Sequence, residues 1–311
     1  MIIVTGGAGF IGSNLVHVLN ARGRDDIVVV DDLTDGHKFA NLAGARFADY
    51  LDRAEFRRAV VADADLGPIT AVLHQGACSE TTEWNGQYML DNNFTVSKEL
   101  FAWCRRRALP FVYASSAAVY GAGTDFREDA PELRPLNVYG WSKLVFDRWV
   151  ARQEPGDARV VGLRYFNVYG PREAHKGRMA SVVHHFDQQL RTSGEVRLFA
   201  ASHGVADGGH RRDFVHVDDI VAVNLWAMAA PGAKGVYNVG TGTSRTFNDL
   251  ARAVIAERGH GSIAYIPMPP DLAGAYQAFT EADISRLRAD GYAAPFLTIE
   301  DGVGRTLDAA L

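Results

Sequence analysis

Tyr139 and Lys143 are the two residues of this sequence whose types and spacing point most directly to chemistry. They lie four positions apart, and residues four apart share one face of a helix, so the Lys143 ammonium can lie beside the Tyr139 phenol. A phenol with a pKa near ~10 is a poor base at neutral pH, and an adjacent cation favours the phenolate. The pair therefore predicts a phenol suited to proton transfer, with Ser115 and Ser116 upstream of it.

Tyr-x-x-x-Lys alone is common on surface helices, so the pair by itself is weak evidence of a catalytic site. A glycine-rich segment at the start of the chain supports the catalytic interpretation. The apolar run 2–5 leads into Gly6, Gly9 and Gly12, and an amphipathic stretch follows. This order of strand, tight turn and helix lets the backbone approach a pyrophosphate, which rests on the positive end of the helix. A second expected strand, 27–30, ends in Asp31, where a carboxylate would meet the adenosine ribose. The sequence therefore predicts a dinucleotide site.

Composition excludes several classes of protein. The 311 residues are 47% hydrophobic, which is enough for a sizeable core, and the net charge of −5 gives no basic surface for nucleic acid or an anionic membrane. No apolar run approaches the ~20 residues of a membrane span, and the first residues already belong to a strand rather than to a signal peptide. Cys78 and Cys104 lack the spacing of a disulfide framework or a metal site. We expect a cytoplasmic protein without a bound metal.

Strand and helix patterns alternate along the first half of the chain, which predicts an α/β fold with a Rossmann-type doubly wound parallel sheet. Catalytic loops then gather at the carboxyl ends of the strands. Beyond residue 170 the alternation loosens into a smaller, discontinuous substrate domain. Further strands are expected near 46–48, 71–74, 111–115 and 160–164, and helices over 88–106 and 139–153. The expected dinucleotide-binding domain is 1–170 with about 213–240 and 277–290, and the expected sugar-binding domain is about 171–212, 241–276 and 291–311.

The glycine pattern, Tyr139 with Lys143, and the segments 113–121 and 164–172 resemble the extended short-chain dehydrogenases that modify nucleotide sugars. A closer resemblance, to the family of ADP-glycero-manno-heptose 6-epimerases, spans nearly the whole chain. It is carried by segments 74–84, 89–93, 173–181, 212–215 and 276–280. The resemblance implies inversion of C6 in ADP-D-glycero-β-D-manno-heptose to give the L-glycero epimer, through transient oxidation and re-reduction with bound NADP. This step supplies a heptose of lipopolysaccharide, and the family forms homo-oligomers, a pentamer being the candidate assembly.

The resemblance also implies roles for four catalytic residues. Tyr139 takes or gives the hydroxyl proton, Lys143 holds down the pKa of Tyr139 and contacts the nicotinamide ribose, and Ser116 bonds to the same oxygen. Inversion benefits from a second acid or base, and by resemblance this group is Lys176.

The implied cofactor residues surround both ends of the dinucleotide. Beside Asp31, Asp32 would repel a 2′-phosphate and favour NAD, whereas Lys38 and Arg53 match positions that contact the adenosine half of NADP. NADP is therefore expected, and NAD stays the alternative. Asp32 and Gln75 stand where the family commonly has Asn and Glu. The cofactor set is Gly6, Gly9, Phe10, Ile11, Gly12, Asp31, Asp32, Lys38, Arg53, Gln75, Gly76, Ala77, Cys78, Ser79, Asn92, Lys143, Val168 and Lys176.

For the substrate, a bidentate Arg suits diphosphate oxygens, and Arg212 is the best candidate. Arg178 replaces a residue that is often small in the family. His184 and His185 point about 100° apart on a helix, and no third metal ligand is evident. The substrate set is Ser116, Asn167, Arg178, His185, Phe199, Ala200, Ala201, Ser202, Arg212 and Tyr276.

Alternatives follow from the same residues. Nucleotide-sugar 4,6-dehydratases carry an Asp-Glu pair after the catalytic hydroxyl, but Ala117 and Ala118 stand there, so elimination of water is not expected. A UDP-hexose 4-epimerase or related nucleotide-sugar oxidoreductase stays open, and nucleobase preference separates it from the heptose enzyme. A non-catalytic dinucleotide-binding protein is the third alternative, and the intact Ser116, Tyr139 and Lys143 oppose it.

Overall fold

The computed structural model describes residues 1–154, 156–269 and 277–309, and these form two compact units. The first unit comprises Met1–Val119, Pro135–Arg164 and Val221–Tyr237. The second comprises Tyr120–Arg134, Tyr165–Ile220 and the described residues from Asn238 onward. This division differs from the expected domains, since 120–134, 213–220 and 277–290 lie with the second unit. Asn238 shows why: its side-chain NH₂ donates to the Phe126 and Asp283 carbonyls, and its backbone N–H to Glu128.

The first unit is built on a seven-stranded sheet of order β11-β6-β5-β4-β1-β2-β3. The pairs β1–β2, β1–β4, β2–β3 and β4–β5 run parallel, which confirms the doubly wound Rossmann-type fold. The strand order reverses between β1 and β4, the switch point where such sheets bind ligands at the carboxyl ends of their strands. The strands are β1 (Ile2–Thr5), β2 (Ile27–Asp31), β3 (Asp49–Asp52), β4 (Ala71–His74), β5 (Phe111–Ser116), β6 (Val160–Tyr165) and β11 (Gly235–Val239).

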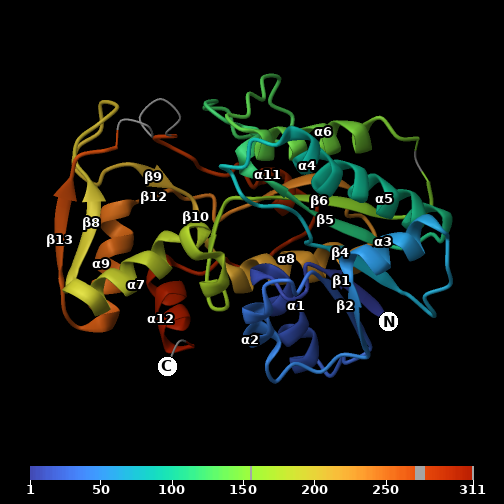
Figure 1. Ribbon diagram of the computed structural model, residues 1–311. Helices are drawn as coiled ribbons and strands as arrows, with labels where there is room; N and C mark the ends of the chain where they lie inside the picture. Colours follow the sequence, from blue (N-terminus) through green and yellow to red (C-terminus); the bar gives the residue numbers. More distant parts are fainter. Residues whose placement is uncertain (155, 270–276, 310–311) are drawn as a thin grey trace. The chain divides into compact units, whose positions relative to one another are not determined.

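Helices cover both faces of this sheet, with α3, α5 and α6 on one face and α1 and α8 on the other (Figure 1). The helices are α1 (Phe10–Ala21), α2 (Phe39–Leu42), α3 (Arg53–Val61), α4 (Gly86–Leu90), α5 (Val96–Arg106), α6 (Val138–Ala151) and α8 (Val217–Ala229), with short turns η1 (Gly36–Lys38), η2 (Asp91–Thr95) and η3 (Ala117–Val119).

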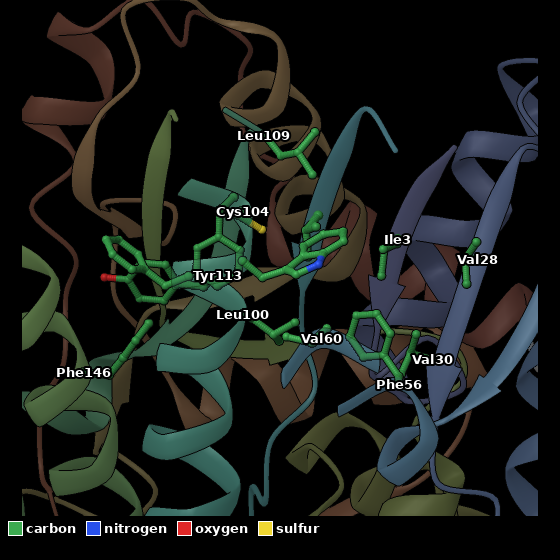
Figure 2. Packing of buried hydrophobic residues seen from close by; sticks show 14 residues of the cluster. Ile3, Val28, Val30, Phe56, Val60, Leu100, Cys104, Leu109, Tyr113 and Phe146 are labelled. Carbon is green, nitrogen blue, oxygen red and sulfur yellow. The ribbon is translucent and has the colours of Figure 1, made fainter. Parts of the chain in front are cut away.

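The core on the α3, α5 and α6 face follows the two-residue period of the strands. Val28 and Val30 of β2 turn toward Phe56, Leu100 and other buried residues of the helices (Figure 2). Fully burying a side chain such as Leu100 stabilises the fold by about 1.5–3 kcal/mol, so this cluster anchors the strands whose ends carry the site.

The predicted bounds of one strand and the predicted continuity of one helix were wrong. The strand expected near 46–48 begins at Asp49, because the Asn20 side-chain oxygen accepts the Arg46 N–H, and the ladder starts with Asp49 opposite Val28. The helix expected over 88–106 is divided into α4 and α5 by the π-helical turn η2. Such wide turns are frequent at functional sites.

The second unit packs three helices and a parallel strand pair around its own core, which includes Val183, Leu198 and Leu250. Its strands are β7 (Asn167–Tyr169), β8 (Glu195–Phe199), β9 (Arg211–Arg212), β10 (Phe214–His216), β12 (Arg245–Thr246) and β13 (Ser262–Ile266). Its helices are α7 (Val182–Ser193), α9 (Phe247–Arg258), α11 (Ser285–Ala289) and α12 (Ile299–Asp308), with the turn η4 (Ala174–Met179). None of the helices in the described ranges is long and apolar enough to cross a membrane.

Candidate functional site

The turn after β1 is too tight for a side chain at Gly6 or Gly12. Gly6 has φ +66°, and the Gly9 N–H donates to the Gly6 carbonyl at 3.0 Å. A Cβ on Gly12 would lie 2.0 Å from that same carbonyl oxygen. Glycine is thus required on both sides of the turn, as a backbone that approaches a phosphate needs.

The first turn of α1 has the character of an anion site. Its N-cap, Gly9, contributes no side-chain hydrogen bond, and its first turn holds no acidic residue. The N–H groups of this end, where Phe10 and Ile11 stand, therefore keep the positive end of the helix dipole for a pyrophosphate. The residues fit a dinucleotide at this position.

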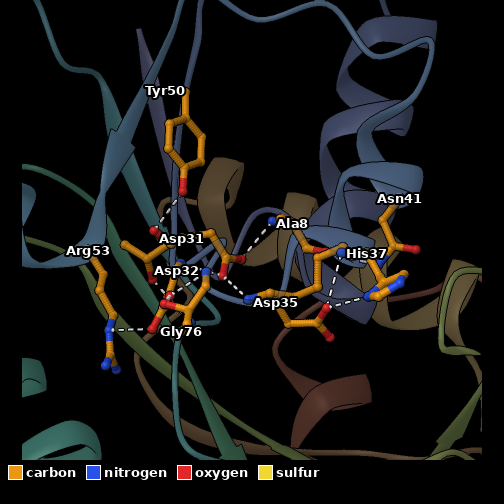
Figure 3. A network of polar contacts seen from close by, with 12 residues as sticks. Ala8, Asp31, Asp32, Asp35, His37, Asn41, Tyr50, Arg53 and Gly76 are labelled. Atoms are coloured by element: carbon orange, nitrogen blue, oxygen red, sulfur yellow. Dashed lines mark hydrogen bonds and ion pairs between the residues drawn. The ribbon is translucent and has the colours of Figure 1, made fainter. Parts of the chain in front are cut away.

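Asp31, at the end of β2, holds the glycine turn in place. Its Oδ2 accepts the Ala8 N–H at 2.8 Å, and its Oδ1 accepts the Asp32 N–H at 2.7 Å and Lys38 Nζ at 2.6 Å (Figure 3). A carboxylate offers about four acceptor positions, so one stays for a ribose hydroxyl.

Asp32 is paired in a different way. The Thr34 hydroxyl and N–H donate to its Oδ1, and Arg53 Nε lies 3.0 Å from its Oδ2 (Figure 3). The Thr34 hydroxyl is the main cause that lowers the pKa of Asp32, and Arg53 adds to it. Asp31 and Asp32 therefore each lie against a cation, and Arg53 also donates to Asn92 Oδ1 at 2.8 Å.

His74 is the centre of a buried hydrogen-bond chain at the end of β4. The Gly76 N–H donates to Thr5 Oγ1, which lies 2.7 Å from His74 Nδ1. On the other side, His74 Nε2 lies 2.9 Å from Ser97 Oγ, whose hydroxyl donates to the Asn93 carbonyl. This direction of donors assigns a neutral imidazole with its proton on Nε2. Burial lowers the pKa of His74 to about 3, and the Lys143 charge adds to the effect.

Asn93, on the π-helical turn, fixes the expected cofactor segment 75–79. Its side chain accepts the Cys78 N–H at 2.8 Å and donates to the Cys78 carbonyl at 2.9 Å and to Ser142 Oγ at 3.0 Å. Gln75 donates to Asn224 on α8. No role was assigned to His74 or Asn93 from the sequence. His74 could have been noticed as a polar residue at the end of an apolar strand. The role of Asn93 depends on the π-helical turn, which the sequence did not predict.

The structure brings Ser116, Tyr139 and Lys143 together at the end of β5. Asn137 caps the helix α6, which begins at Val138, and a Cβ on Gly140 would lie 2.7 Å from the Ala118 carbonyl. Gly140 therefore allows the first turn of α6 to approach η3, so that Tyr139 hydrogen-bonds to Ser116. Lys143 is buried and donates to the Ala114 carbonyl at 2.9 Å.

The pKa of Tyr139 is shifted in the direction opposite to the one expected from Lys143. Burial raises the pKa of the Tyr139 phenol, and the Ser116 hydrogen bond opposes that rise in part. Lys143 Nζ lies 6.0 Å from the phenol ring centroid and is bonded to a backbone carbonyl instead. Burial lowers the pKa of Lys143 to about 8, with Asp147 opposing. The phenol is therefore neutral at neutral pH and is suited to giving a proton.

In the second unit, Lys176 lies on the turn η4. Burial lowers the pKa of its ammonium, and Glu173 opposes the shift. Glu173 also accepts the Ser181 N–H and hydroxyl, which ties this turn to the start of α7. A lysine with a lowered pKa is suited to acid-base work near neutral pH.

The other expected substrate residues of the second unit are spread over several elements. Arg178 is exposed on η4, and its carbonyl lies 3.4 Å from His185 Nε2. Arg212 is buried on β9, and its guanidinium carbon lies 5.7 Å from the Phe247 ring. Asn167 and Val168 belong to β7, and Phe199 ends β8, followed by Ala200, Ala201 and Ser202. Tyr276 lies outside the described residues.

Comparison with known proteins identifies a family and a relative that matches nearly the whole chain. The model of the NAD dependent epimerase/dehydratase family matches residues 2–240. A protein of Alkalilimnicola ehrlichii named ADP-L-glycero-D-manno-heptose-6-epimerase is 60% identical over 310 residues, covering 99% of this chain and 97% of its own.

Solved structures give similar matches. The Helicobacter pylori ADP-L-glycero-D-manno-heptose-6-epimerase matches with a TM-score of 0.85 and 32% identity, over 99% of this chain and 95% of its own. The Thermus thermophilus UDP-glucose 4-epimerase, solved with NAD, matches with a TM-score of 0.80 and 30% identity, over 99% and 98% of the two chains.

The buried His74 predicts acid sensitivity of the fold. An unfolded histidine titrates near ~6.5, whereas the folded pKa is about 3, so below pH ~6.5 only the unfolded state binds this proton. His74 thus contributes stability that is fully present above pH ~6.5 and is lost as the pH falls toward 3. Between pH ~6.5 and ~5 the loss amounts to about 2 kcal/mol.

We expect His74→Asn to remove this dependence in urea unfolding, although the variant is less stable at neutral pH. The exposed His260→Asn serves as the control and should keep the wild-type pH dependence. An equally steep fall in the His74→Asn variant would contradict the assignment.

Proposed function

This chain belongs to the NAD dependent epimerase/dehydratase family, and we propose that it inverts C6 of ADP-D-glycero-β-D-manno-heptose. The observation that carries the proposal is the group Ser116, Tyr139 and Lys143 at the end of β5, in the same unit as a dinucleotide turn. The name of the Alkalilimnicola relative supplies the substrate. The product would serve lipopolysaccharide assembly.

The chemical difficulty is that the C6–H proton of a secondary alcohol is barely acidic. A nicotinamide dinucleotide supplies a hydride acceptor that returns the hydride to the opposite face of the same carbon. The protein has to remove the hydroxyl proton during oxidation and give one back to the alkoxide during reduction. Since the hydroxyl changes its position on inversion, two groups share this work.

We assign the two roles from the directions of the pKa shifts. Lys176, whose pKa burial lowers, loses its own proton more readily than an ordinary lysine, and its neutral amine would take the hydroxyl proton during oxidation. Tyr139, whose pKa burial raises, stays protonated at neutral pH and would give its proton to the oxygen during reduction. Ser116 hydrogen-bonds to the Tyr139 phenol. It would also bond to the same substrate oxygen, and Lys143 would bind the nicotinamide ribose of the cofactor. The assignment of Lys176 rests on the family resemblance.

For the cofactor we propose NADP, held at its 2′-phosphate by Lys38 and Arg53. Asp31 and Asp32 alone would repel that phosphate, but each lies against one of these cations. A lysine ammonium has three donors and a guanidinium has five, so the bonds to the two acids engage only part of them. The cytoplasmic location and the homo-oligomer stay predictions.

Replacing Tyr139 tests the reaction. We expect the wild-type protein to convert ADP-D-glycero-D-manno-heptose to its L-glycero epimer in proton NMR, and UDP-galactose to stay unchanged. Tyr139→Phe should lower kcat by about 10²–10⁴-fold, because the phenolic proton is lost, while cofactor affinity stays the same. Tyr88→Phe, on the exposed face of α4, should keep full activity. Turnover of UDP-galactose alone would favour the hexose 4-epimerase, and undiminished turnover by Tyr139→Phe would rule out the mechanism.

Cofactor preference is testable by fluorescence titration with NADPH and NADH. Lys38→Ala and Arg53→Ala should each weaken NADPH binding by about 10–100-fold, since a charge-assisted hydrogen bond is worth about 1.5–3 kcal/mol. NADH binding should change much less. The control is Arg58→Ala, an exposed residue of the same helix as Arg53. Equal losses for both nucleotides would argue against a 2′-phosphate site here.

A further inference from the structure

One face of α6 is joined to β5 at three successive helical turns. Tyr139, Lys143 and Asp147 follow at intervals of four residues, so they share this face. Tyr139 hydrogen-bonds to Ser116, and Lys143 donates to the Ala114 carbonyl at 2.9 Å. Asp147 makes the third connection, and the reaction proposed above gives it no role.

Asp147 is a buried carboxylate whose two oxygens are both engaged, and only 3% of the residue is exposed. Its Oδ2 accepts the Ser115 hydroxyl at 2.9 Å and Arg164 Nε at 2.9 Å. Its Oδ1 accepts the Tyr113 hydroxyl at 3.2 Å. Two residues of β5 and one of β6 are thereby fixed to the helix that carries Tyr139 and Lys143.

Lys143, Asp147 and Arg164 are all buried, and Asp147 is the acid of the three. Without Asp147, these buried charges would be two cations and no anion. Among the ionisable groups near Lys143 are His74 on β4, Cys78 on the following loop and Tyr139 on its own helix. Of the two groups that oppose the effect of burial on the pKa of Lys143, Asp147 is the larger and Cys78 the smaller.

We propose that Asp147 is a positioning residue that fixes the end of β5 against α6 and places a negative charge on the face of the helix that carries Lys143. The carboxylate acts through Lys143 and through Ser115 and Tyr113, and it touches neither substrate nor cofactor in this role. The proposal rests on the proposed function only for its consequence in turnover. The charge state of Lys143 is a property of the folded chain alone.

The test is Asp147→Asn, which keeps the size of the side chain and removes its charge. Lys143 is followed by the pH dependence of its trace acetylation with acetic anhydride, read by mass spectrometry of the peptide that contains it. We expect the pKa of Lys143 to fall by about one unit from the wild-type value, because a nearby opposite charge is lost. Because the proposed function uses the Lys143 ammonium at the nicotinamide ribose, the alkaline limb of the kcat profile should move to lower pH by the same amount.

Three further variants separate this role from simple stability. Asp147→Glu should restore the wild-type limb. Arg164→Gln removes a cation of the cluster instead of its anion, so it should raise the pKa of Lys143, and this comparison decides the matter if Asp147→Asn does not fold. Asp187→Asn is the matched control, since Asp187 is a buried acid of α7 paired with Arg258 at 2.5 Å. It should lower the melting temperature without moving the pKa of Lys143.

An unchanged pKa of Lys143 in both Asp147→Asn and Arg164→Gln would overturn the proposal. If the acetylation shifts occur but the wild-type protein does not convert the heptose substrate, the proposed function fails and the role of Asp147 stands.

Discussion

The register of four neighbouring parallel strands decides where the groups of the first unit's site lie. Thr5 lies opposite both Val30 and His74, and His74 lies opposite Tyr113, so β2, β1, β4 and β5 end at one edge. The glycine turn, Asp31, the segment 75–79 and Ser116 follow from those ends. A slip of one residue would turn each side chain to the opposite face of the sheet, so the buried apolar residues of the strands specify the register. The same register determines where the polar residues at the strand ends lie.

The strands bring the loops to one edge of the sheet, and buried polar groups then fix the conformation of these loops. The chain Gly76–Thr5–His74–Ser97–Asn93 joins the loop after β4 to the π-helical turn, and Asn93 continues it to Ser142 on α6. Such networks stabilise and specify a structure when every member is satisfied, and they are costly when one member is lost. The dinucleotide turn and the helix that carries Tyr139 are thereby parts of one hydrogen-bonded system.

The sequence predicted what local patterns decide: the parallel sheet, the glycine turn, Asp31 at the end of β2, and the Tyr139–Lys143 helix. The sequence did not predict the features that depend on tertiary contacts. The start of β3 depends on the Asn20 side chain, and the π-helical turn on contacts of Asn93 with a loop far away in sequence. The pKa of Tyr139 depends on a competition between burial and the Ser116 hydrogen bond, whose outcome sequence spacing cannot predict. The role of Asp147 became visible only with Ser115, Tyr113 and Arg164 around it.

The central claim is that the protein moves only the hydroxyl proton, while the hydrogen on C6 leaves and returns as a hydride. The most direct measurement is epimerisation of ADP-D-glycero-D-manno-heptose in D₂O, followed by NMR of C6 in the product. The account predicts the L-glycero epimer with protium at C6 and no wash-in of solvent deuterium. Deuterium at C6 would show that a proton is abstracted from this carbon, and it would contradict the roles given to Tyr139 and Lys176.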